Sequence, residues 1–242
     1  MKLETLSWEE VGSYLDTSKG IFLPTGSIEQ HGPLGLIGTD AICAREICWA
    51  AAEDCNAIVA PELAYAPAPF NMSFPGTVSI SEGLFRQLAH EVLSAFSHHG
   101  FQKIYVLNGH GANLAPLRQA AKDIGCDVRI RSWWDFDQVN VLRQKWYGDW
   151  EGMHATPAEI AITQHTHRIL VNPNLAAPQK LTPAYIQAHA GDKHGPADEH
   201  RRDFPDGRVG SHSGLATPNH GKVLLKSAAK AVAADYQAFL TT

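Results

Sequence analysis

Acidic and imidazole side chains gather in a short stretch near the start of this 242-residue chain. Glu29 and His31 are two residues apart in the run LPTGSIEQHGPLG, and Asp40 follows shortly after them. In an extended segment, residues i and i+2 point to the same side, so this carboxylate and imidazole would lie together. His110 stands between two glycines in the run NGHGAN, which allow its loop a close approach. Carboxylate and imidazole ligands without thiolates suit zinc, manganese or iron, so these residues predict a metal site.

The elements that must position these residues alternate between strands and helices. Short apolar runs predict strands, and apolar residues at helical spacing predict helices. The strands are expected at residues 20–24, 57–60, 103–107 and 127–131, and the helices at residues 40–54, 115–124 and 221–239 and from residues 81 and 156 onward. This alternation predicts a mostly parallel sheet with helices on both faces. Ligands bind at the carboxyl ends of the strands in such sheets, where the loops of Glu29 and His110 emerge.

Two helix starts bear on the site. Asp40 falls at the beginning of an expected helix, in a good position to cap its N-terminus. Thr156 and Pro157 open a later helix, and Glu159 lies just behind them. The sequence therefore predicts that both carboxylates are held by the first turns of helices.

The stretch 187–219 differs from the rest of the chain. It is rich in glycine, proline and aspartate and has little periodicity, so we expect a long loop. It carries four histidines, with acidic residues among them: His189, His194, His200 and His212, with Asp192, Asp198 and Glu199. A second metal cluster is one interpretation, but the spacing is too loose for a recognised zinc signature. We favour a solvated loop that lies over the site or touches a neighbouring subunit.

Composition limits the class of protein. Hydrophobic residues make up 44% and charged residues 19%, which is ordinary for a globular protein, and the length fits one domain spanning residues 1–242. A net charge of −5 gives no reason to expect a nucleic-acid partner. The chain has no apolar run long enough for a membrane span, an acidic start unlike a signal peptide, and four scattered cysteines. These features predict a cytoplasmic protein.

Three runs resemble, in order, the motifs of the creatininase family of amidohydrolases: LPTGSIEQHGPLGLIGTDAICA, NGHGAN and GMHATPAEIA. The resemblance covers nearly the whole chain and implies a three-layer α/β/α fold with a two-metal site. It also implies a homo-oligomer, often a hexamer. By matching motif positions, the ligands would be Glu29, His31, Asp40 and His110, with Asp40 bridging the ions. His154 and Glu159 would also belong to the active site.

One residue departs from the pattern of creatininase proper, in which a glutamate two residues after the loop histidine binds metal. That position here is Ala112, which offers no ligand atom. A second ion therefore needs another carboxylate, and we take Glu159 to supply it. The same departure weakens the case for creatinine itself as the substrate.

The expected reaction is hydrolysis of a C–N bond in a small cyclic amide or formamide. Two ions would activate a water, and backbone N–H groups of the glycine loops would help to hold the oxyanion. His154 would protonate the leaving nitrogen, unless it only orients a ligand. Trp133, Trp134 and Asn113 are the residues expected to contact substrate, although the tryptophans could equally belong to the core or to a subunit contact.

Other classes of function fit less well. The run GSHSG resembles a nucleophile elbow, but its central residue is His212 and not serine. The chain has neither a G-x-G-x-x-G nor a Walker pattern for nucleotides. A non-catalytic metal- or ligand-binding protein stays open, because ligands alone do not make a catalyst. If the protein is an enzyme, three reactions remain possible: ring opening of creatinine, deformylation of a formamidopyrimidine and cleavage of a modified peptide.

Overall fold

A parallel sheet of four strands forms the centre of the protein, in a computed structural model that describes residues 1–191 and 193–242. The strands are β1 (Gly20–Thr25), β2 (Ile58–Val59), β3 (Lys103–Asn108) and β4 (Asp127–Ser132). Their order in the sheet is β2-β1-β3-β4, and every neighbouring pair is parallel. The register aligns Thr25 with Asn108 and Asn108 with Ser132, so three strands end on one line. This edge is where a ligand site is expected in a parallel sheet.

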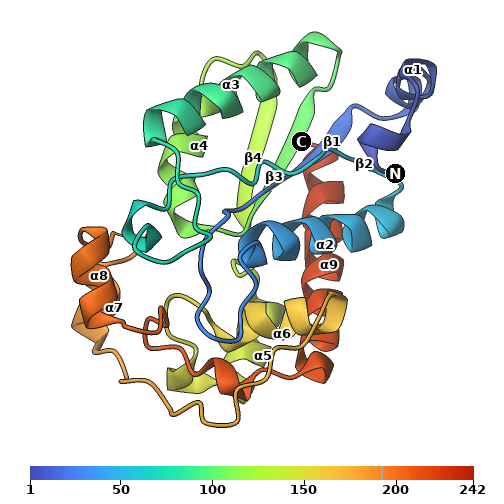
Figure 1. Cartoon of the computed structure of the whole chain (residues 1–242). Coiled ribbons are helices and arrows are strands. Elements are labelled where there is room, and N and C mark those ends of the chain that lie inside the picture. Colours follow the sequence, from blue (N-terminus) through green and yellow to red (C-terminus); the bar gives the residue numbers. More distant parts are fainter. Residues whose placement is uncertain (192) are drawn as a thin grey trace.

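Helices cover both faces of the sheet (Figure 1). Their bounds are α1 (Trp8–Thr17), α2 (Thr39–Cys55), α3 (Glu82–His98), α4 (Leu114–Ala120), α5 (Asp137–Trp146), α6 (Pro157–Thr166), α7 (Pro183–Ala188), α8 (Ala197–Asp203) and α9 (Pro218–Leu240). The arrangement is the three-layer α/β/α architecture that the sequence predicts. No helix among the described residues is long and apolar enough to cross a bilayer.

Alternate residues of the strands feed two separate apolar cores. Phe22 and Tyr105 point to a core shared with α2, α5, α6 and α9, whereas Ile21 and Ile104 point to one shared with α1, α3 and α4. This division follows from the two-residue period of a strand, which sends neighbouring side chains to opposite faces. Because both faces are covered, β1 is buried along its whole length. The sheet is therefore held on both sides, which gives the loops at its carboxyl edge a fixed base.

Two glycines let the loops after β1 and β3 press against the start of α2. A Cβ on Gly26 would lie 2.2 Å from the backbone nitrogen of Ala41, and one on Gly109 would lie 2.2 Å from the carbonyl oxygen of Asp40. Neither distance is possible for a side chain, so only glycine fits at these points. The glycines thus set how closely the two loops approach the first turn of α2.

The structure corrects several predictions of local structure. Asp40 lies in the first turn of α2 but does not cap it, since the N-cap is Gly38 and no side chain bonds the free N–H groups there. The stretch 187–219 is not one long loop, because it contains α8, the end of α7 and the start of α9. Four of the described helices lay outside the expected set, namely α1, α5, α7 and α8. The helix predicted at 115–124 ends at Ala120.

We expect Gly109→Ala to disturb the protein and Gly83→Ala to leave it intact. The first change forces a methyl group against Asp40, and overpacking of this kind costs about 1–3 kcal/mol. The second lies in α3 with no atom within 4 Å of its Cβ, so helix propensity should stabilise it by roughly 0.5–1 kcal/mol. Denaturant unfolding of both variants measures the difference, and equal stabilities would contradict the close approach described here.

Candidate metal centre and active site

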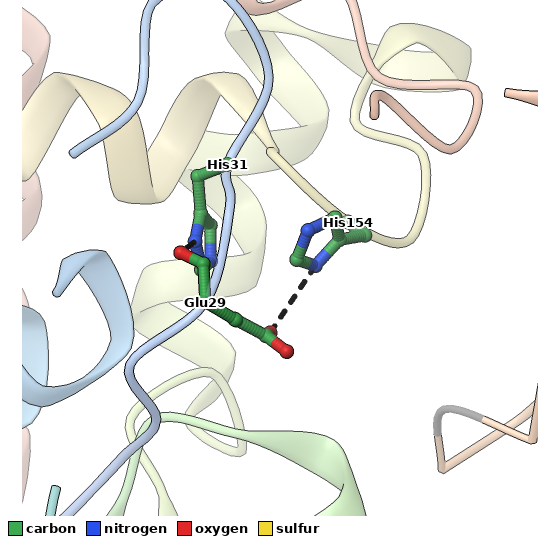
Figure 2. A group of neighbouring side chains, drawn as sticks. All are labelled: Glu29, His31 and His154. Atoms are coloured by element: carbon green, nitrogen blue, oxygen red, sulfur yellow. Dashed lines mark hydrogen bonds and ion pairs between the residues drawn. The ribbon is translucent and has the colours of Figure 1, made fainter. Parts of the chain in front are cut away.

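Six ionisable side chains meet at the carboxyl edge of the sheet. Glu29 and His31 lie on the loop after β1, Asp40 on α2, and His110 directly after β3. His154 and Glu159 arrive from the loop before α6 and from its first turn. None of the six is more than 7% exposed. Figure 2 shows His154 reaching toward Glu29 and His31 from a different part of the chain. The structure therefore brings together every residue predicted to bind metal or to act in catalysis.

Asp40 occupies the middle of the group. Its Oδ1 lies 2.8 Å from Nε2 of His31, and its Oδ2 lies 3.0 Å from Nδ1 of His110. Oδ2 also accepts a hydrogen bond of 2.8 Å from the hydroxyl of Ser27. The two oxygens of one carboxylate thus face two different imidazoles. A carboxylate with this arrangement can bridge two ions.

The three imidazoles are oriented in the same way. One ring nitrogen of each lies within hydrogen-bond distance of a backbone carbonyl: Nδ1 of His31 with Glu29, Nε2 of His110 with Pro67, and Nε2 of His154 with Gln30. Since a carbonyl oxygen only accepts, that nitrogen carries the hydrogen in each ring. The other nitrogen points to the carboxylates. Histidines that bind metal are held in this way by a second hydrogen bond.

Glu29 is fully buried, and its two oxygens differ. Oε2 accepts a hydrogen bond of 3.0 Å from the side-chain amide of Asn71. Oε1 accepts no hydrogen bond from any described residue, although Nδ1 of His110 lies 3.2 Å away and Nδ1 of His154 lies 3.6 Å away. A buried carboxylate oxygen without a hydrogen bond costs free energy unless something binds it. A cation at this oxygen fits that need.

Glu159 is tied to the helix that carries it. Thr156 and Glu159 form a capping box, in which the Glu159 carboxylate accepts a 2.6 Å hydrogen bond from the Thr156 backbone N–H. Its Oε1 lies 3.9 Å from Nε2 of His31. Burial raises the pKa of Glu159 to about 8, against the lowering effect of His31, and the charge of Asp40 adds to the rise. A nearby cation would favour the charged carboxylate and so lower this pKa.

Protons on the imidazoles balance the negative charges of the carboxylates in this group. Burial alone would lower the pKa of His31, but the ion pair with Asp40 outweighs it and raises that pKa to about 10. Burial would likewise raise the pKa of Asp40, yet His31 and His110 hold it far below its usual range. Protonated imidazoles therefore neutralise the carboxylates when no metal is bound. Metal ligands must be deprotonated, so an ion would take the place of these protons.

Three sets of ligand atoms in the group are close enough to surround an ion: Glu29, Asp40 and His110; His31, Asp40 and Glu159; and Glu29, His31 and His154. The first two sets share Asp40, use Glu29, His31, His110 and Glu159 once each and leave out His154. They would divide these five residues between two ions, with Glu159 as the carboxylate expected to replace the one absent at Ala112. The third set competes with both, because it takes Glu29 from one and His31 from the other. The residues present thus fit two divalent ions bridged by Asp40.

A cavity of about 180 Å³ opens beside these residues. Its lining includes four of these residues, Asp40, His110, His154 and Glu159, together with Trp133, Trp134 and Arg143. Trp134 is partly buried, whereas Trp133 is 1% exposed and also packs in the core. Both tryptophans are thus placed where a substrate would lie, and their contact with it stays a prediction.

Asn113 has a different environment from the one expected. It is fully buried and is not among the described residues that line the cavity. Its amide nitrogen donates to the carbonyl of Gly26 and to Oδ1 of Asn108. These bonds tie the loop after β3 to the loop after β1. In this structure Asn113 therefore holds the two loops together, and a contact with substrate would require it to leave those partners.

The histidine-rich stretch packs near the site and is not a freely solvated loop. Helix α8 lies against the short 3-10 turn Pro69–Asn71, and His200 on that helix is 3% exposed. The ring of Phe70 contacts the rings of both His200 and His154. Among the described residues of this stretch no three ligand atoms come close enough to hold an ion. Asp192 lies outside the described residues.

Three side chains that support the site were not singled out from the sequence. Ser27 bonds Asp40, Asn71 bonds Glu29, and the Gln30 amide donates to both Asn71 and the Gly207 carbonyl. Ser27 and Gln30 stand beside residues that were identified, which is a usable signal. Asn71 lies far along the chain from Glu29, in the run FNMSFPGT. Its role in binding Glu29 becomes visible only from the contacts in the folded structure.

The chain resembles known proteins in sequence. The family model for creatininase, described as creatinine amidohydrolase, matches residues 4–235. Creatinine amidohydrolase of Pseudomonas putida is 27% identical over 160 residues, which cover 59% of this chain and 61% of that protein. Mycofactocin precursor peptide peptidase of Mycolicibacterium smegmatis is 33% identical over 119 residues, 47% of this chain and 48% of that protein. The matched stretches thus span less than two thirds of these relatives.

Solved structures share the fold over the whole chain. A crystal structure of creatinine amidohydrolase superimposes with a TM-score of 0.79 at 20% identity, covering 100% of this chain and 98% of that one. A manganese form of creatininase and the zinc–zinc form of a creatininase mutant give TM-scores of 0.77 and 0.75, both at 19% identity. At this level of identity the agreement concerns the fold.

We expect Asp40→Asn to abolish metal binding and Glu159→Gln to leave about one ion per chain. Asp40 is common to both ligand sets, whereas Glu159 belongs to one. Metal content after dialysis against zinc or manganese measures both variants. Asp137→Asn is the matched control, because Asp137 is also an aspartate in the first turn of a helix but is exposed. It should bind as the unchanged protein does. Two ions retained by Glu159→Gln would exclude Glu159 as a ligand.

Proposed function

The chain belongs to the creatininase family of amidohydrolases, and on that premise we propose that it hydrolyses a C–N bond of a small amide with two divalent ions. The observation that carries the proposal is the position of Asp40 between two ligand sets of two further residues each. One ion would be held by Glu29, Asp40 and His110, and the other by His31, Asp40 and Glu159. Solved zinc and manganese forms of creatininases support these metals, and iron is a third candidate from the donor set. Bound ions supply an activated water and polarise the amide carbonyl.

His154 is the side chain we assign to proton transfer. Its Nε2 is 2.7 Å from the carbonyl oxygen of Gln30 and therefore carries the hydrogen of the neutral ring. Burial is the main cause that lowers the pKa of His154, so the ring is neutral at pH 7. Nδ1 then has a free lone pair that faces the site. It can accept a proton from the attacking water and afterwards deliver it to the nitrogen that leaves.

The earlier expectation for His154, protonation of the leaving nitrogen alone, thus becomes the second half of its role. As the water oxygen bonds to the carbonyl carbon, Nδ1 takes its proton. As the C–N bond breaks, the same proton passes to nitrogen, so that an acid and an amine result. Its near neighbour Glu29 would stabilise the imidazolium formed between the two steps.

A backbone donor for the developing oxyanion is available in the loop after β3. Gly109 donates its N–H to the carbonyl of Thr25, and His110 donates its N–H to Oδ1 of Asn108. The remaining glycine of this loop, Gly111, lines the cavity. We assign the oxyanion contact to its N–H, in place of the several glycine donors expected from the sequence.

The size of the cavity favours a small-molecule substrate. A space of about 180 Å³ accommodates a compact amide and not an extended peptide. Creatinine, a formamide such as a formamidopyrimidine, and the end of a modified peptide remain the candidates. Ala112 in place of an acidic ligand speaks against creatinine. One relative is a creatinine amidohydrolase and another is a precursor peptide peptidase, so the family name does not choose between them.

Further features of the protein follow from the same premise. We propose one creatininase-like domain across residues 1–242, because the site draws on elements from β1 to α6 around one sheet. We also propose a homo-oligomer, with a hexamer as the form to test by sedimentation, and a cytoplasmic location. Neither nucleic acid nor a membrane is expected as a partner.

We expect metal removal to abolish hydrolysis reversibly. Protein treated with a chelator and then desalted should release no amine or formate from a panel of amides, and zinc or manganese should restore the activity. The physical reason is that without the ions nothing polarises the amide carbonyl or lowers the pKa of the attacking water, from which His154 would take a proton. Full turnover by the metal-free protein would contradict the proposal.

We expect His154→Ala to lower kcat by about 10²–10⁴-fold, the usual contribution of a positioned acid–base group. Metal content should stay at two ions, because neither proposed ligand set includes His154. His165→Ala is the matched control, since His165 is an exposed imidazole on the following helix and should leave kcat unchanged. If His154→Ala instead loses an ion with its activity, the residue is a ligand and the assignment is wrong.

A further inference from the structure

A positive charge lines the same cavity as the metal-ligating residues. Arg143 projects from α5 into the lining, in the company of Trp133 and Trp134. Its guanidinium carbon lies 5.8 Å from the centre of the Trp133 ring. The reaction proposed above gives this residue no task. An arginine beside a small cavity needs a separate explanation, because most arginines place their charge in bulk water.

The guanidinium is held in one orientation by two neighbours. Nε donates to Oε1 of Glu151 at 2.8 Å, and Nη1 donates to Oδ1 of Asn140 at 2.8 Å. Nη2 makes no hydrogen bond to a described residue. Because the donors of arginine lie in one plane, fixing two of them also fixes the direction of the third. Nη2 is thus a pre-oriented donor for something that is not part of the described chain.

The charge of the surroundings favours an anion as that partner. Glu151 neutralises Arg143 on the side of the loop that precedes α6. With two divalent ions bound, the three carboxylates of Glu29, Asp40 and Glu159 leave an excess of one positive charge. A substrate with one negative charge would therefore be attracted at both ends of the cavity. Planar arginine pairs particularly well with a carboxylate.

We propose that Arg143 binds a carboxylate of the substrate, so that the substrate class is a small amide that also carries a carboxylate group. The inference rests on the proposed function, because it assumes that the amide lies against the metal-ligating residues. The cavity of about 180 Å³ is small enough for one compact molecule to reach both Arg143 and His154. Arg143 is thereby a specificity-determining residue that binds substrate without taking part in bond cleavage.

The test compares two formamides that differ only in charge, N-formylglycine and N-formylglycinamide. The zinc-loaded protein should bind N-formylglycine at least tenfold more tightly by calorimetry, and any formate release should show the same preference in KM. The double variant Arg143→Met/Glu151→Gln removes both charges, so that no buried carboxylate loses its partner. It should raise the Kd and KM for N-formylglycine about 10- to 100-fold, as expected for a lost charge-assisted hydrogen bond, with little change in kcat. Arg143→Lys should recover part of the loss.

Arg131→Met is the matched control. Arg131 on β4 forms an ion pair with Asp235 on α9 and is not among the residues that line the cavity. Its replacement should therefore change the affinity for neither formamide. Zinc content and the unfolding midpoint of each variant show that the site and fold survive. If the unchanged protein binds both formamides equally, or if the double variant keeps the preference because zinc alone holds the carboxylate, the proposal is wrong. Absence of formate release with an intact, Arg143-dependent binding preference would overturn the proposed reaction and leave this inference standing.

Discussion

The site depends on one carboxylate, Asp40, whose two oxygens face two imidazoles from different strands' loops. The first turn of α2 must therefore lie against the ends of both β1 and β3. Gly26 and Gly109 permit this approach, since any side chain at either point would collide with the backbone of α2. Because the carboxylate and the imidazoles are buried away from water, each charge must have a partner of opposite charge or a hydrogen bond. Everything else in the site is arranged around that shared carboxylate.

Much of this could be predicted from the sequence, for identifiable reasons. Apolar runs marked β1 and β3, because strands covered on both faces are mostly apolar between their ends. The site residues followed those runs directly, so parallel-sheet geometry placed Glu29 and His110 together. The ligand role of Asp40, expected from its residue type and position and from the resemblance, stays a prediction, whereas its expected role as a helix cap was wrong. An aspartate that caps a helix and an aspartate that binds metal occupy the same position in a sequence. Only the tertiary contacts of the carboxylate oxygens distinguish them.

The rest could not be predicted, because it depends on contacts between distant segments. Asn71 supports Glu29 across many intervening residues, and nothing in its own run marks it out. Helix α8 sits in a stretch without apolar periodicity, and the packing of His200 beside Phe70 helps to position it. Arg143 looks like a surface residue in a polar helix until the fold turns it toward the cavity.

The central claim is that Asp40 bridges two ions and that Glu159 replaces the carboxylate absent at Ala112. The most direct measurement is a crystal structure of the manganese- or zinc-loaded protein with anomalous scattering from the metal. Two peaks about 3.5–4 Å apart, with Asp40 between them and Glu159 bound to the ion beside His31, are the predicted result. A single peak, or two peaks with Glu159 still bonded only to its helix, would contradict the account.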